Sequence, residues 1–117
     1  MASNDIAREI AQALKEFTGD VERGLEKEKE RVAKEGAAKL KRTSPKDTGK
    51  YAKGWREKKN GSARVVYNAT KPQLTHLLEK GHAKRGGGRV AGKEHIRPVE
   101  QEMIEEFEAA TERIIRG

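Results

Sequence analysis

Apolar residues recur every three or four positions through the first third of the chain. They are Ile6, Ile10, Leu14, Phe17, Val21, Leu25, Val32 and Leu40. Such a stripe is typical of an amphipathic helix with one buried face, and it predicts a helix over about residues 4–42 of the N-terminal segment 1–42. Because glycine destabilises a helix interior, a break near Gly19 is an alternative. A continuous helix would be roughly 55 Å long, so we expect part of it to project or to pack on a neighbour.

The next segment, residues 43–69, carries the signals of a turn followed by a β-hairpin. Turn-forming residues are dense from Thr43 to Lys50 and end the helix by Ser44. Two short runs, Trp55–Lys59 and Ala63–Ala69, are joined through Asn60-Gly61, a dipeptide that favours a type I′ hairpin turn. The pattern therefore predicts a small antiparallel sheet.

Two helices and a loop are predicted in the C-terminal part. A short helix, residues 73–81, has three leucines on one face and stops at Gly81 as its C-cap. Residues 82–95 follow as a basic, glycine-rich loop. A final amphipathic helix, residues 98–115, opens at Pro98. Its apolar stripe consists of Val99, Met103, Ile104, Phe107, Ala110, Ile114 and Ile115.

This order of elements indicates an α+β fold. A length of 117 residues is typical of a single domain, and we expect one that spans residues 1–117. The C-terminal helix is expected to pack on the small sheet. Only 33% of the residues are apolar and 38% are charged, so the core must be thin, which favours oligomerisation as a source of stability.

Charge is unevenly distributed along the chain. Residues 1–40 hold eight basic and nine acidic residues, residues 41–97 hold sixteen and four, and residues 98–117 hold two and six. A basic middle beside an acidic end suits either nucleic-acid contact or head-to-tail packing of identical subunits. No signal peptide and no run long enough to cross a bilayer is present in the sequence. We therefore expect a soluble protein, kept inside the producing cell, that makes no membrane contact.

The sequence matches the motifs of zinc sites, phosphate-binding loops and catalytic groups poorly. His76, His82 and His95 lack the short spacing of a zinc site, and the chain has no cysteine, so we expect no metal and no disulfide. The segment Lys46–Lys50 lacks the upstream glycine of a phosphate-binding loop, and Tyr51 stands where the magnesium-binding hydroxyl belongs. No nucleophile and base, and no pair of catalytic carboxylates, can be argued. We expect no cofactor and no enzymatic activity.

A basic tract in the predicted loop is the main candidate for binding. Its cations are Lys84, Arg85, Arg89, Lys93 and Arg97. The Arg-Gly-Gly-Gly-Arg segment resembles RNA-binding tracts, so a basic nucleic-acid-binding module that uses residues 82–97 is one hypothesis. No aromatic residue lies within the tract to stack on bases, which favours a loop that becomes ordered on a protein partner.

The arrangement also resembles a known family, the small tail-completion or head–tail joining proteins of long-tailed bacteriophages, which are often labelled minor tail or minor capsid components. In that family a long helix leads into a Thr-Gly turn, a hairpin with a tyrosine-containing strand, a Glu-x-Gly segment, a glycine-rich loop and a final helix opened by proline. The matching positions are Thr48 and Gly49, Val66-Tyr67-Asn68, Glu79 and Gly81, and Pro98.

The resemblance implies a structural role in a phage or prophage virion. Several copies would form a ring at the head–tail neck and contact other neck and tail proteins, with assembly in the bacterial host cytoplasm. The basic loop would then face either packaged DNA or the acidic C-terminal helix of the next subunit. We favour the protein contact, because the chain itself supplies the complementary charge.

Overall fold

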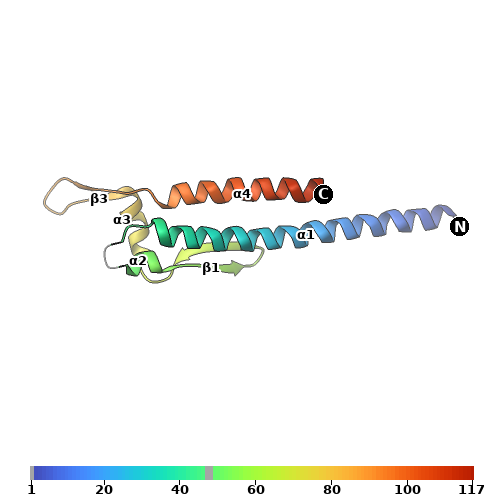
Figure 1. The fold of residues 1–117 in the computed structure, drawn as a ribbon, viewed down its shortest axis with the longest axis horizontal. Coiled ribbons are helices and arrows are strands. Elements are labelled where there is room, and N and C mark those ends of the chain that lie inside the picture. Colours follow the sequence, from blue (N-terminus) through green and yellow to red (C-terminus); the bar gives the residue numbers. More distant parts are fainter. Residues whose placement is uncertain (1, 47–48) are drawn as a thin grey trace.

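A computed structural model describes residues 2–46 and 49–117, with side chains from Ile6 onward. The molecule is a rod of 83 × 21 × 21 Å (Figure 1). The N-terminal part of the first helix alone forms one end of its long axis, and the shorter elements gather toward the other end. The elements are α1 (Ala2–Thr43), α2 (Lys50–Lys53), β1 (Trp55–Asn60), β2 (Ala63–Asn68), the 3-10 helix η1 (Pro72–Leu74), α3 (Thr75–Lys80), β3 (Gly81–Ala83), β4 (Arg89–Ala91) and α4 (Ile96–Arg116). The predicted α+β class is confirmed.

Helix α1 is continuous and runs through Gly19 without a break, so the alternative of two helices is wrong. Two other glycines in α1 lie where α4 approaches closely. A Cβ at Gly36 would overlap the Met103 sulfur, and one at Gly24 would come within 3.3 Å of Ile114. The pairs also show that α4 runs antiparallel to α1 (Figure 1).

The hairpin β1–β2 is confirmed, but its turn is shifted by one residue. The strands pair from Trp55 with Asn68 to Asn60 with Ala63, which leaves Gly61 and Ser62 as the two turn residues. Gly61 has φ +63° while Ser62 is not left-handed. That pattern is typical of a type II′ turn, in which only the first central residue needs positive φ. Asn60 instead forms the last pair of the ladder.

The predicted loop 82–95 is wrong in part, because residues 82–83 and 89–91 belong to a second antiparallel hairpin. Strand β3 pairs with β4 from Gly81 with Ala91 to Ala83 with Arg89. Gly87 and Gly88 have φ of +105° and +78° and supply the reversal between the strands. Glycines that suggested an unstructured loop therefore build its turn.

Helix α4 begins at Ile96, two residues before Pro98, and its first turns meet the sheet. The core joins Leu40 of α1, Tyr51 of α2, Trp55 of β1 and Val99 of α4, with Val66 and Met103 among the residues packed against it. The predicted packing of the last helix on the sheet holds at this end. Along the rest of its length α4 lies on α1.

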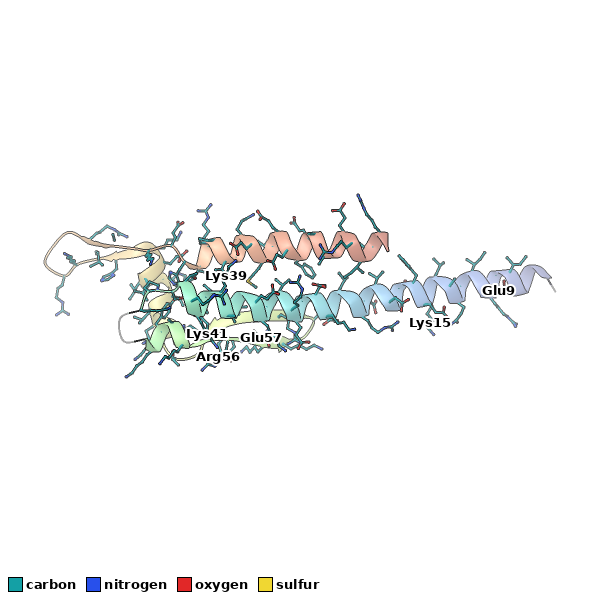
Figure 2. All side chains as sticks on the ribbon, in the orientation of Figure 1. Glu9, Lys15, Lys39, Lys41, Arg56 and Glu57 are labelled. Atoms are coloured by element: carbon teal, nitrogen blue, oxygen red, sulfur yellow. The ribbon has the colours of Figure 1, made fainter. Side chains whose placement is uncertain are left out.

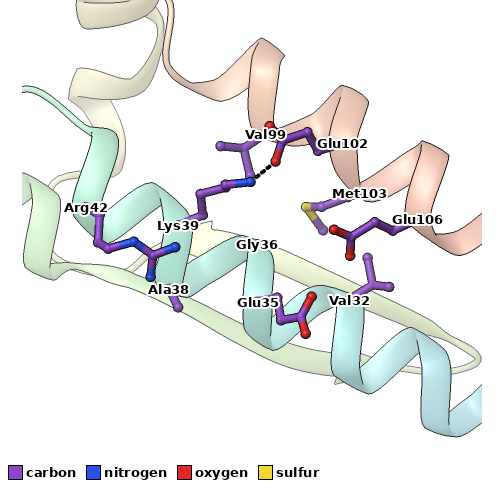
Figure 3. Close-up of a pocket in the computed structure, with 10 residues that line it drawn as sticks. All are labelled: Val32, Glu35, Gly36, Ala38, Lys39, Arg42, Val99, Glu102, Met103 and Glu106. Carbon is purple, nitrogen blue, oxygen red and sulfur yellow. Dashed lines mark hydrogen bonds and ion pairs between the residues drawn. The ribbon is translucent and has the colours of Figure 1, made fainter.

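A groove follows the α1–α4 contact (Figure 3), and charged side chains cross it. Lys39 forms an ion pair with Glu102, and Arg31 lies 3.6 Å from Glu106. Both pairs are partly exposed, so each contributes little to stability. They agree with the register of α4 on α1 that the close contacts of Gly36 and Gly24 set.

One hydrogen bond in this core leads to a test of the fold. The Trp55 indole donates to Ser44 Oγ at 2.8 Å, and both residues are buried. We expect Ser44→Ala to lower the free energy of unfolding by about 1–3 kcal/mol, because the buried N–H loses its acceptor. Urea denaturation followed by tryptophan fluorescence would measure it. Thr43→Ala, at the neighbouring exposed hydroxyl, serves as the control, and an equal loss in both variants would contradict the assignment.

Candidate functional site

The predicted interaction surface lies on the hairpin β3–β4, which projects from the end of the rod opposite the N-terminus (Figure 1). We call residues 82–93 the basic arm. Lys84 and Arg85 lie in its turn, Arg89 opens β4, and Lys93 follows β4, all exposed. Arg89 donates to the carbonyl of Lys80 at 3.1 Å. Within the described residues none of these four side chains has a carboxylate partner.

Arg97 is separate from this group. It lies in the first turn of α4, where its side chain is exposed and its backbone N–H is hydrogen-bonded to Glu79. The structure therefore brings four of the five predicted cations together on the arm and places the fifth at the arm's base.

Glu79, quoted above as part of the Glu-x-Gly motif, caps α4 from a distance in the sequence. One carboxylate oxygen accepts from the backbone N–H of His95 at 2.8 Å and of Ile96 at 2.9 Å, and the other from Arg97 at 3.0 Å. The first four N–H groups of a helix have no partner within it. The fourth position here is Pro98, which has no N–H. Glu79 thus accepts a hydrogen bond from every backbone N–H group that has no partner within the helix at the start of α4.

His95 and Tyr51 extend the same buried network. His95 Nδ1 faces only acceptors, the Lys93 carbonyl at 2.7 Å and Glu79 Oε1 at 3.0 Å, so it carries the proton. Nε2 then accepts from the Tyr51 hydroxyl at 2.7 Å. A Tyr-His-Glu line can relay protons in enzymes. Here all three residues are at least 93% buried, and their contacts hold α4 against α2.

The surroundings shift the pKa of Glu79 and the pKa of Tyr51 in opposite directions. Burial alone would raise the pKa of Glu79, but the three backbone N–H groups and the nearby His95 outweigh it and lower the pKa below its ordinary value. Burial, with a smaller contribution from the Glu79 charge, raises the pKa of Tyr51 to about 12. The Tyr51 hydroxyl therefore stays protonated at neutral pH and can donate to His95.

The remaining motif residues are turn and junction positions. Gly81 has φ +79°, and a Cβ on it would overlap the carbonyl oxygen of Val90. Gly49 has φ +87° and precedes α2. Thr48 lies outside the described residues. Sequence reasoning missed the contacts of His95 and Tyr51, because their partners are distant in the chain and no local pattern links them.

The described residues contain no group of three or more His, Cys, Asp or Glu side chains placed to hold a metal ion. Their helices include none that is both long and apolar enough to span a bilayer.

One protein-family model matches more than half of the chain. The family model described as "Bacteriophage HK97-gp10, putative tail-component" matches residues 7–81, from the first turns of α1 to the end of α3 and Gly81. The chain belongs to this family. The resemblance to small phage tail proteins is thereby confirmed. No curated protein and no solved structure matches the chain. The match to the HK97-gp10-like family includes Gly49, Glu79 and Gly81, whereas the whole of the basic arm and the whole of α4 lie beyond it.

Proposed function

We propose that this phage tail component is a non-enzymatic structural protein of the head–tail neck, which completes or joins the tail by ring-like self-assembly. The family assignment supports the virion as its location and other tail proteins as its partners. Assembly would take place in the cytoplasm of the bacterial host. The neck and the ring are the finer parts of the proposal.

The observation that carries self-assembly is the separation of unpaired charges of opposite sign. The basic arm holds four cations without carboxylate partners among the described residues. Of the α4 glutamates, Glu102 and Glu106 pair with α1 and Glu112 pairs with Arg116, whereas Glu100, Glu105 and Glu108 form no ion pair in the described chain. An arm and a helix of opposite charge on one molecule favour a head-to-tail contact between copies.

Charge reversal on the arm tests this contact. We expect the mass of the wild-type chain in sedimentation velocity to rise with concentration. Lys84→Glu combined with Arg85→Glu should raise the concentration for half-assembly roughly five- to tenfold, because each lost rim ion pair is worth about 0.5 kcal/mol or somewhat more. The matched control is Lys46→Glu combined with Lys59→Glu, an equal charge change at exposed positions outside the arm.

The competing hypothesis, a nucleic-acid-binding module, predicts the opposite behaviour. The same four cations could neutralise phosphates, and the affinity would then fall steeply with salt. If the chain stays monomeric at high concentration and binds short DNA tightly at physiological salt, the assembly proposal is wrong. Fluorescence anisotropy with a short duplex over a salt series would measure this.

A further inference from the structure

The N-terminal part of α1 carries an apolar face that the described chain leaves uncovered. Its members, the N-terminal stripe, are Ile6, Ile10, Leu14 and Phe17, and they are 54–62% exposed. Figure 2 shows this segment projecting past the rest of the molecule, with Glu9 and Lys15 among its side chains. Further along α1 the same face is covered by α4, as at Gly24 and Ile114. Helices in proteins gain most of their stability from packing of an apolar face, so we expect this projecting segment to have a partner.

Helix α4 carries a second stripe, of three apolar residues and a threonine, beside the one that faces α1. Its members, the outer stripe, are Ile104, Phe107, Thr111 and Ile115. Ile104 and Ile115 are 44% and 55% exposed. Phe107, Thr111 and Ile115 line a shallow hollow on the surface of α4. The residues that face α1, such as Val99 and Ala110, lie on a different side of the helix and are buried.

The two stripes have the same spacing in opposite order. The N-terminal stripe advances by four, four and three residues, and the outer stripe by three, four and four. In an antiparallel pair of helices the spacings must reverse in this way for the members of the two stripes to lie opposite one another. Ile6 then lies opposite Ile115, Ile10 opposite Thr111, Leu14 opposite Phe107 and Phe17 opposite Ile104. The helices α1 and α4 of one chain already pack antiparallel.

We propose that the N-terminal stripe of one copy packs antiparallel on the outer stripe of the next copy. This inference rests on the self-assembly proposed above and names the two surfaces that meet. The contact is heterologous, since two different faces meet, so it repeats from copy to copy and can close a ring. One interface covers both exposed stripes, whereas pairing of two N-terminal stripes would leave the outer stripe in water.

The near-neutral charge of the N-terminal segment is compatible with packing on α4 of another copy. Its composition disfavours a membrane surface or nucleic acid as the partner. Between Ile6 and Phe17 the cations Arg8 and Lys15 balance the anions Glu9 and Glu16. A neutral segment is not repelled by the acidic α4. Helices that bind membrane surfaces have a polar face rich in lysine and arginine, which this segment lacks. Nucleic acid offers no apolar surface for the stripe.

The same register positions the basic arm. Arg31 of a chain faces its own Glu106, and Leu14 of the neighbour would face Phe107, so the neighbour is displaced by about 16 residues, or roughly 24 Å at 1.5 Å per residue. The displacement is toward the end of the rod that bears the arm (Figure 1). It brings the arm of one copy alongside the middle of the next, where the acidic α4 lies.

The contact is expected to be weak for a single pair of copies. Three helical turns bury much less than the roughly 800 Å² per partner of a standard interface. In a closed ring each copy makes the contact twice, and closure converts the last association into an intramolecular one. Assembly should therefore depend steeply on concentration.

Disulfide trapping tests the register, because the chain has no cysteine of its own. Four full-length variants, Ile6→Cys, Phe17→Cys, Ile104→Cys and Ile115→Cys, change exposed positions. Circular dichroism would check that each one folds. Each N-terminal variant is mixed with each α4 variant, one partner carries a mass tag, and the mixture is oxidised. The tag distinguishes cross-linked heterodimers from homodimers in intact mass spectra.

Two combinations are in register, positions 6 with 115 and 17 with 104, and two are not, 6 with 104 and 17 with 115. A disulfide requires Cα atoms within about 7 Å, and the off-register pairs are separated by roughly 16 Å along the helix. We expect at least about fivefold more heterodimer for the in-register pairs.

Three results would overturn the inference. If a further mixture, of Ile6→Cys with Phe17→Cys, gives more heterodimer than the in-register pairs, the N-terminal stripe pairs with itself. If all four combinations react equally while native mass spectrometry shows an oligomer, the interface lies elsewhere and the proposed self-assembly stands. If the wild-type chain also remains monomeric at every concentration, the proposed self-assembly fails together with the inference.

Discussion

Replacing Glu79 by glutamine should destabilise the protein by about 2–3 kcal/mol, the usual loss for buried hydrogen bonds to a charged group. The substitution keeps the size of the side chain. It removes the charge and turns one of the two acceptor oxygens, which receive from His95, Ile96 and Arg97, into a donor. Two donors would then face each other at the start of α4. For a chain of this length the melting temperature should fall by roughly 8–12 °C.

The matched control is Glu94→Gln, which removes the same charge at an exposed position one residue before His95. We expect a change within about 0.5 kcal/mol there. Differential scanning calorimetry would compare the two variants with the wild type. An equal and small effect in both would show that the cap adds nothing to the helix.

The pH dependence of stability provides an independent check on the same group. The folded pKa of Glu79 lies below its ordinary value of 4.5, so its contribution is complete above about pH 4.5 and is lost as pH falls through the folded pKa. The difference in unfolding free energy between wild type and Glu79→Gln should therefore shrink below pH 4.5 and stay constant above it. A difference that grows with acid would contradict a lowered pKa.

Much of the fold follows from local sequence patterns. The stripe from Ile6 to Leu40 predicts α1, and the run Val99 to Ile115 predicts α4, because helical periodicity extends over many turns in each. The hairpin β1–β2 and the helix end at Gly81 were also predictable from turn residues. The predicted positions of turns and helix ends are wrong by one or two residues where two neighbouring positions could each form the turn, as at Gly61.

The junction at the base of α4 was beyond prediction from the sequence. Glu79 reaches donors 16 to 18 residues later, and His95 reaches Tyr51 44 residues away. A carboxylate in a short helix looks solvated when its partner is separated by a loop of unknown path. The second hairpin was missed for the same reason. Its three-residue strands are held by tertiary contacts at their base more than by their own propensity.

These contacts isolate the basic arm from the body. Backbone bonds close the arm near its base, including Lys93 N–H to the Leu78 carbonyl at 2.8 Å. The hydrogen bond between Glu79 and His95 lies on the body side of that base. Substitutions at the arm tip should therefore leave the Glu79 cap of α4 intact. The arm can therefore vary in charge without unfolding α4, which suits a surface adapted to a partner.

Replacing Gly92 by alanine is expected to have the other large effect, a loss of about 3 kcal/mol or more, at or beyond the upper end for overpacked sites. A Cβ at this position would overlap the backbone N of Gly81 and lie 2.5 Å from the carbonyl oxygen of Glu79. Backbone atoms cannot rotate away as a side chain can. The arm would have to separate from α3, and the Glu79 carboxylate would then lose its alignment with α4.

Gly86→Ala is the matched control, because a Cβ there meets nothing within 4 Å and its φ is not left-handed. Urea denaturation of both variants should show a large loss for Gly92→Ala and less than about 0.5 kcal/mol for Gly86→Ala. The double variant with Glu79→Gln should lose less than the sum of the single losses, because both changes disrupt one junction. Full additivity would mean that the arm base and the α4 cap are independent.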